Sequence, residues 1–315
     1  MIRFLIYRLL SAIPVLFVVT LVTFLIMWLV PGDITAEIGG IDASAADLQA
    51  IRERLGLDQP LWERAIRWYG DLFQGDLGHS YLLNRSVTDA VFERLPVTLS
   101  LAGISLVLAT GMGMLLGILA SVRHNTWLDQ SAMITALIGL SIPDFWFGLV
   151  MIILFGVWLG WLPTGGFVPL TEDPIGWARS MVLPAFTLAI TQMGVIARMT
   201  RSSMLDVLGQ DYIRTAKAKG MASHTVIFRH GLGNAMIPIV TVVGVISGVL
   251  LSGAVVIETV FSLPGAGRLI IGAIQRRDFP IIQGGLLITA CVFVFVNILV
   301  DMAYVWFDPR GRDDS

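Results

Sequence analysis

The sequence predicts an all-α polytopic membrane protein with six transmembrane helices and a folded outer loop between the first two. Of its 315 residues, 56% are hydrophobic and 14% are charged, and the mean hydropathy is +0.79. Soluble domains carry roughly a quarter charged residues, and a soluble fold of this length could not hide so much apolar surface. The composition therefore excludes a soluble enzyme, a disordered chain and a disulfide-linked secreted domain.

Six apolar runs are each long enough to cross a bilayer as a helix, which takes about 20 residues. They cover residues 9–30, 97–121, 131–162, 181–197, 235–257 and 281–300, and the last continues to residue 307. The third run is too long for one straight span and too short for two, so we expect Pro143 to separate an entry segment from the span proper. The first run exceeds the length of a signal-peptide core, and no small-x-small cleavage site follows closely, so we expect a retained helix.

The positions of Lys and Arg predict the orientation. With the N-terminus in the cytoplasm, the cytoplasmic segments carry 11 of these residues and the two short outer loops carry four. This agrees with the positive-inside rule, in which a loop as long as residues 31–96 counts little. That loop holds six basic and 11 acidic residues, a net charge of −5. We expect both termini inside and the following division: a first helix at 1–30, an outer loop domain at 31–96, a core with five spans at 97–307 and a cytoplasmic tail at 308–315.

Two short helices are expected in the outer loop. Residues 45–55 form the first, with Ser44 as its N-cap and Gly56 as its end. The second runs from residue 61 to residue 73, and its apolar face comprises Leu61, Ala65, Trp68, Tyr69 and Leu72. A lid over helix ends and a surface that contacts substrate or a delivering partner both fit this pattern.

The inner loop of residues 198–234 contains two helical segments around a glycine. The first segment holds two small alanines and both lysines of the chain. Gly220 suits a left-handed position that ends this helix, and Ser223 can cap the next one. A loop that only fixes topology would explain the basic residues but not the helix stop at Gly220 followed by a helix cap at Ser223. We therefore expect an ordered surface that another protein can approach closely.

The stretch Arg214-Thr-Ala-Lys-Ala-Lys-Gly220 resembles the Glu-Ala-Ala-x(3)-Gly motif of ABC-importer permeases, with Arg214 and Thr215 in place of the leading Glu and the first Ala. These departures are typical of the dipeptide/oligopeptide/nickel branch of the family. Within this branch, the chain most resembles dipeptide and glutathione importer subunits. Further segments that resemble this branch cover nearly the whole chain: Leu55-Gly-Leu-Asp-Gln-Pro-Leu61, Gly75-Asp-Leu-Gly78, Asn234-Ala-Met-Ile-Pro238, Glu258-Thr-Val-Phe-Ser-Leu-Pro-Gly265 and Asp308-Pro309-Arg310.

The resemblance implies an inner-membrane subunit with the fold of type I importer permeases. Its partners would be a second homologous permease, two cytoplasmic ATPases and an external solute-binding protein. The ATPases would bind ATP and Mg, because this chain lacks a G-x-x-x-x-G-K-[ST] loop, and we expect no cofactor on it. The residues expected to couple to the ATPases are Arg214, Thr215, Ala216, Lys217, Ala218, Lys219, Gly220, Ser223, Phe228 and Arg229.

Four polar residues in the apolar runs could line a translocation path or contact a neighbouring helix: Asp144, Gln192, Asn297 and Asp301. An ionisable side chain at the bilayer centre costs about 2.5 to 3.5 kcal/mol on insertion scales and needs a reason. Asp144 fits either the inner interface or the pore, and Asp301 fits pairing with a basic residue. The small residues Gly111, Gly113 and Gly117 are typical of helix-packing positions.

The sequence predicts no catalytic site and no metal site. The four histidines, His79, His124, His224 and His230, fall on opposite sides of the membrane, and no hydrolase constellation can be assembled on one surface. The net charge of −2 gives no basic surface for nucleic acid. We expect a permease that imports di- or oligopeptides or similar solutes by alternating access. The alternatives are a nickel or other solute permease of the same family, a secondary transporter or channel without ATPases, and a non-transporting membrane anchor.

Overall fold

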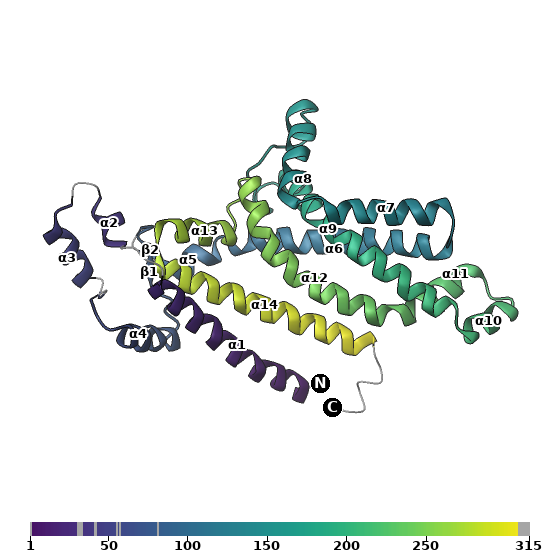
Figure 1. The fold of residues 1–315 in the computed structure, drawn as a ribbon, viewed down its shortest axis with the longest axis horizontal. Coiled ribbons are helices and arrows are strands. Elements are labelled where there is room, and N and C mark those ends of the chain that lie inside the picture. Colours follow the sequence, from purple (N-terminus) through teal and green to yellow (C-terminus); the bar gives the residue numbers. More distant parts are fainter. Residues whose placement is uncertain are drawn as a thin grey trace. The chain divides into compact units, whose positions relative to one another are not determined.

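The computed structural model describes residues 2–29, 34–40, 43–54, 56, 58–80 and 82–307, and this part of the chain is almost entirely helical (Figure 1). The expected tail at 308–315 lies outside the described residues, as does residue 55 at the end of the first expected loop helix. The elements, in order, are α1 (Ile2–Leu29), α2 (Ile34–Gly39), α3 (Ala45–Arg54), α4 (Leu61–Phe73), β1 (His79–Ser80), β2 (Arg85–Ser86), α5 (Val87–Phe92), α6 (Leu95–Val122), α7 (Trp127–Ser141), α8 (Asp144–Met151), the π-helix η1 (Ile152–Trp158), α9 (Pro174–Leu208), α10 (Asp211–Ala218), α11 (Ser223–Thr225), the π-helix η2 (Val226–Leu232), α12 (Gly233–Val260), α13 (Ala266–Arg276) and α14 (Phe279–Phe307).

Five helices in the described residues are long and apolar enough to cross a membrane: Ile6–Leu25, Val87–Val122, Pro174–Leu208, Ser223–Val260 and Phe279–Met302. A sixth span results if α7 and the continuous segment α8–η1 count as one broken span. These two pieces meet at an angle of 101°. Pro143 lies in extended conformation at the break, because its ring prevents the helix from continuing. The expected division of the third run at Pro143 is confirmed.

The chain divides into two compact units. The first comprises Thr98–Leu263 and the chain from Phe295 onward, and the second comprises Ile2–Val97 and Pro264–Val294. In the first unit α9 is the central helix, and it packs against α7, α8 and α12. It begins at Pro174, and the side chain of Asp173 accepts a hydrogen bond from the backbone N–H of Ile175 at 3.0 Å. Proline suits this first position because its missing N–H would have no partner there.

Two of the three glycines expected at helix contacts allow α6 to approach α9. A Cβ atom on Gly113 would lie 2.8 Å from the carbonyl oxygen of Met193, and one on Gly117 would lie 2.6 Å from that of Ala197. Gly111 is different, because a Cβ there would meet nothing within 4 Å. The packing role is therefore confirmed for Gly113 and Gly117, whereas for Gly111 the expectation was wrong.

The core of the second unit joins α5, α13, the start of α14 and the loop before the β1–β2 hairpin. Its fully buried members include Val87, Val91 and Ile281. Polar groups complete it: the hydroxyl of Ser80 donates a hydrogen bond to the carboxyl of Asp278, which is 2% exposed. Burial raises the pKa of Asp278, and the bond from Ser80 opposes this only in part.

The outer loop forms the two expected helices. Ser44 caps α3, since its hydroxyl oxygen accepts from the N–H of Asp47 at 3.2 Å while the Asp47 carboxylate accepts from the N–H of Ser44 at 3.0 Å. The hydroxyl of Ser44 also donates to the Asp47 carboxylate at 2.6 Å, and this bond, together with the one from the Ser44 N–H, lowers the pKa of Asp47. The helix ends before Gly56, which has a φ of +63°.

The second loop helix, α4, has the expected bounds and packs on α1 with the expected face. The hydroxyls of Tyr69 and Thr20 are 2.7 Å apart, and the ring of Trp68 meets the ring of Phe24 edge-on at 5.5 Å. The helix is therefore fixed against the first span by one hydrogen bond and an aromatic cluster.

Candidate functional site

The candidate site is the segment of residues 211–232, which comprises α10, Gly220, α11 and η2 and which we call the elbow. Helix α10 ends in a Schellman motif. The N–H of Gly220 donates to the carbonyl of Lys217 at 3.0 Å, and the N–H of Met221 donates to that of Ala216 at 3.3 Å. Gly220 has a φ of +78°, which an L side chain rarely adopts. The expected left-handed stop is confirmed.

A small apolar core holds the two arms of the elbow together. It consists of Ile213 and Ala216 from α10 and Val226 from η2, with Met221 and Leu208 packed against it. The contact between Met221 and Ala216 is the one that usually accompanies a Schellman motif. The turn at Gly220 is therefore a packed structure rather than a loose connection.

Nine of the ten residues expected to couple to the ATPases are exposed: Arg214, Thr215, Lys217, Ala218, Lys219, Gly220, Ser223, Phe228 and Arg229. The tenth, Ala216, is 8% exposed and belongs to the core of the elbow. Phe228 presents a ring that is 57% exposed, beside the cationic side chain of Arg229. The elbow thus offers an aromatic group and several positive charges on an ordered backbone.

The expected capping role of Ser223 was wrong. Helix α11 begins at Ser223 itself, Ala222 occupies the capping position, and no side chain caps this helix. The hydroxyl of Ser223 is therefore free of the backbone bond that the sequence suggested. It faces the cavity described below.

Two polar residues that the sequence interpretation did not single out fix α10 to the start of α12. The side-chain amide of Asn234 donates to the hydroxyl of Tyr212 at 3.0 Å and to the carbonyl of His230 at 2.9 Å. Asn234 is the first residue of a segment that carries the family resemblance, and Tyr212 lies two residues before the Arg214–Gly220 stretch. The family resemblance was the only sequence signal for these two residues, and only the fold shows that their side chains are hydrogen-bonded to each other.

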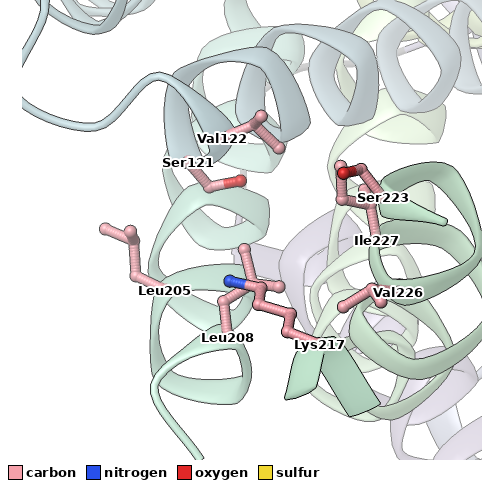
Figure 2. A pocket seen from close by; sticks show the side chains of 8 residues that line it. All are labelled: Ser121, Val122, Leu205, Leu208, Lys217, Ser223, Val226 and Ile227. Atoms are coloured by element: carbon pink, nitrogen blue, oxygen red, sulfur yellow. The ribbon is translucent and has the colours of Figure 1, made fainter. Parts of the chain in front are cut away.

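A cavity of about 340 Å³ lies between the elbow and the ends of α6 and α9 (Figure 2). Five of the eight described residues that line it are apolar, and the others are two serines and one lysine. The lining residues are Ser121, Val122, Leu205, Leu208, Lys217, Ser223, Val226 and Ile227.

A buried ion pair connects α7 with α9 in the same unit. Nε of Arg201 lies 2.5 Å from one carboxylate oxygen of Asp129, and its Nη2 lies 2.7 Å from the other. The N–H of Asn125 adds a bond of 3.0 Å, and Asp129 is only 3% exposed. A bidentate contact between an arginine and a carboxylate holds the two helices in a defined register. The partners are 72 residues apart, so no local pattern could have predicted it.

The four polar residues of the apolar runs are all half-buried. The carboxylate of Asp144 accepts a hydrogen bond from Thr191 of α9, directly beside Gln192. Asp144 therefore contacts a neighbouring helix, at the break between α7 and α8. Asn297 and Asp301 lie on α14 in the first unit.

Glu258 in α12 is fully buried and accepts a hydrogen bond from the hydroxyl of Thr98 in α6 at 2.5 Å. The sequence interpretation named Glu258 as the start of a segment that carries the family resemblance but did not predict its burial or its partner. Within the described residues, no three His, Cys, Asp or Glu side chains lie close enough together to hold a metal ion.

Comparison of the sequence with known protein families identifies the family of this chain. Residues 113–313 match the family described as the inner membrane component of binding-protein-dependent transport systems, and residues 1–102 match the N-terminal region of such membrane components. The chain belongs to this permease family. Such a permease works together with an ATPase and a substrate-binding protein, and this chain is the permease component of a binding-protein-dependent ABC importer.

The permease has close relatives over its full length. It is 46% identical, over 98% of both chains, to a protein of Brucella abortus named as a peptide transport system permease protein. It is 41% identical, over 99% of both chains, to the glutathione transport system permease protein GsiC of Escherichia coli strain K12.

Solved structures share the fold of the permease. Two crystal forms of the MetNI methionine ABC transporter, described as inward facing, match with TM-scores of 0.54 and 0.55 at 18% and 17% identity. They cover 67% and 69% of this chain and 93% and 95% of the matched chains. The all-α polytopic fold of an importer permease is confirmed.

Proposed function

We propose that this permease forms the translocation path for di- or oligopeptides, or similar small solutes, by alternating access. Relatives named for peptide and glutathione transport support this substrate class. The proposed assembly contains a second homologous permease, two cytoplasmic ATPases that bind ATP and Mg, and an external solute-binding protein. The chain itself binds no cofactor or metal in this proposal and catalyses no reaction.

The single observation that carries the proposal is the elbow. An ordered turn with a left-handed glycine, an exposed aromatic ring and several cations is suited to transmit movement from another protein into α9 and α12. Closure of the ATPase dimer would push on the elbow, and the attached helices would switch between inward-open and outward-open states.

The proposed placement follows from the distribution of basic residues. The elbow and both termini lie in the cytoplasm, and the loop of residues 31–96 lies outside, where it can meet the binding protein. We retain the expected division into residues 1–30, 31–96, 97–307 and 308–315 as part of this proposal. Asp144, Gln192, Asn297 and Asp301 are candidates for the path or for helix contacts within it.

Cross-linking tests the coupling role. In a Cys291→Ser background, Phe228→Cys should form a cross-link to an ATPase subunit in the assembled complex, because its side chain is 57% exposed on the elbow. The matched control is Trp62→Cys, which is similarly exposed on α4 in the outer loop and should give none. A cross-link from the control, or none from Phe228→Cys, would contradict the assignment.

Reconstitution separates the permease from its alternatives. Peptide uptake into liposomes should require ATP, both ATPases and the binding protein. Uptake by this polypeptide alone would indicate a secondary transporter or channel, and no flux in any combination would indicate an anchor. Binding of nickel rather than peptide by the associated binding protein would move the assignment to a nickel permease.

A further inference from the structure

The cavity beneath the elbow has the chemistry of a site for an amphiphilic anion. Its apolar wall is formed by side chains such as Leu208, Val226 and Ile227, and none of the eight described residues that line it is acidic. The nitrogen of Lys217 points into this space, and the hydroxyls of Ser121 and Ser223 face it from opposite sides (Figure 2).

Lys217 lacks a counter-ion of its own. Nowhere in the described part of the chain does a side chain form a hydrogen bond or ion pair with its ammonium group, although α10 carries acidic Asp211, which pairs with Arg214 at 3.3 Å. The ammonium group of Lys217 and the hydroxyl of Ser223 can donate to the oxygens of a phosphate, whereas the hydroxyl of Ser121 already donates to the carbonyl of Ile118 at 2.8 Å.

We propose that this cavity binds the phosphate headgroup of an anionic phospholipid of the inner leaflet. The cavity lies where α6 and α9 end, on the side of the helices that the proposed topology places in the cytoplasm. Basic pockets between helices on the cytoplasmic side are suited to such headgroups. Its volume of about 340 Å³ accommodates a headgroup and the first carbons of the chains, whereas the remaining acyl chains would lie along the outside of the helices.

A lipid in this position would touch the elbow and the helix bundle at the same time. Lys217 and Ser223 belong to the elbow, whereas Ser121 belongs to α6. Bound lipid would therefore brace the elbow against the bundle. The inference rests on the proposed placement of the elbow at the inner membrane surface, but it does not require that the elbow couples to an ATPase.

The test counts lipids on the assembled importer. The purified complex is depleted of lipid, incubated with phosphatidylglycerol or with phosphatidylethanolamine, and analysed by native mass spectrometry. Phosphatidylglycerol should be retained in preference, and Lys217→Gln should weaken its binding about fivefold, as expected for the loss of one lysine–phosphate contact. Ile227→Trp, which fills the cavity without changing charge, should reduce binding as well.

Lys219→Gln is the matched control, because Lys219 lies two residues away on the same elbow and does not line the cavity. It should leave lipid retention unchanged. Equal losses in the two lysine variants, or equal retention of the two lipids, would overturn the site. Competition by inorganic phosphate at the same concentration as the lipid would overturn its lipid nature in favour of a soluble anion.

Cross-linking of Phe228→Cys to the ATPase, measured on the same preparations, keeps the two proposals apart. Loss of lipid from Lys217→Gln with intact cross-linking of Phe228→Cys to the ATPase would support both. Retained lipid selectivity without any ATPase cross-link would count against coupling alone.

Discussion

At Gly220 the cost of a substitution comes from the backbone conformation and not from the space around the residue. A Cβ atom there would meet nothing within 4 Å, yet the φ of +78° places the residue in the left-handed region. That region costs an L residue about 1 to 2 kcal/mol, least for Asn and most for β-branched side chains. Gly233 is the matched case, with an equally open Cβ position but helical backbone.

We expect coupling to follow backbone strain at Gly220. Substrate-stimulated ATPase activity of the full complex should be retained best in Gly220→Asn, fall in Gly220→Ala and be lost in Gly220→Val, while membrane insertion stays intact. Gly233→Ala should behave as wild type. An order that follows side-chain size instead, with Asn worse than Ala, would show that a partner fills the space around this residue.

The buried carboxyl of Asp278 makes the stability of the second unit depend on pH. Because burial raises its pKa in the folded state, its contribution to stability is complete below the ordinary value of about 4 and is lost as the pH rises through the higher folded value. Wild type should therefore lose thermal stability over that window. Asp278→Asn, whose amide oxygen can still accept a hydrogen bond from Ser80, should give a flatter profile.

The measurement is the melting temperature of the purified complex between pH 4 and pH 8. Asp71→Asn serves as the control, since Asp71 is an exposed carboxyl on α4 of the same unit. If the Asp278→Asn profile runs parallel to that of wild type, the pH dependence has another source.

At the scale of helices, the contact between α6 and α9 depends on two of three neighbouring glycines. Gly113→Ala or Gly117→Ala would place a methyl group within 3 Å of a backbone oxygen of α9 and force the helices apart. Overpacking of this kind typically costs about 1 to 3 kcal/mol. Gly111→Ala should be neutral or stabilising by up to about 1 kcal/mol, because alanine favours a helix and the position is open.

Thermal unfolding of the three variants checks this expectation. Similar losses in all three would mean that glycine is needed for helix flexibility rather than for close approach. The sequence showed the small residues but not which of them meet α9, because that depends on the rotation of α6 about its axis.

The packing of helix α4 against α1 should depend on one of the two tryptophans of α4. Trp68 is half-buried against α1, whereas Trp62 is 62% exposed on the same helix. Trp68→Ala should release α4 and cost about 2 to 3 kcal/mol, somewhat below the 3 to 5 typical of fully buried aromatics. Limited proteolysis should then cleave the loop of residues 31–96 faster in Trp68→Ala than in Trp62→Ala, and equal rates would contradict the packing role.

Local signals in the sequence predicted the elements well. The apolar runs, the cap at Ser44, the stops at Gly56 and Gly220 and the break at Pro143 each follow from chemistry within a few residues. The failures have physical reasons too. Ser223 lies one residue after the capping position, an offset that sequence patterns do not resolve. Ala216 was predicted to be a contact residue because a small side chain suits both a surface and a core.

At the scale of the whole molecule, the sequence could not predict contacts between distant segments. Asp129 with Arg201, Thr98 with Glu258 and Ser80 with Asp278 each join residues more than 70 positions apart. Such pairs depend on which helices become neighbours, and a charge in the sequence does not reveal its partner. The cavity beneath the elbow could not be predicted either, since five separate elements line it.

The orientation of the molecule can be tested with its own lysines. Lys217 and Lys219 are the only two in the chain, so amine-reactive reagents modify the elbow and the N-terminus alone. A membrane-impermeant reagent should label the elbow peptide in inside-out vesicles and leave it unmodified in right-side-out vesicles. Labelling in right-side-out vesicles would place the elbow outside and refute the proposed topology.

The single cysteine gives the natural chain a spectroscopic handle that needs no engineering. Cys291 is a free thiol exposed on α14, in the part of this helix that belongs to the second unit. A nitroxide attached there would report oxygen and nickel-chelate accessibility at one position of α14. Lipid-like accessibility in the isolated chain that disappears on assembly would indicate that the second permease docks along α14.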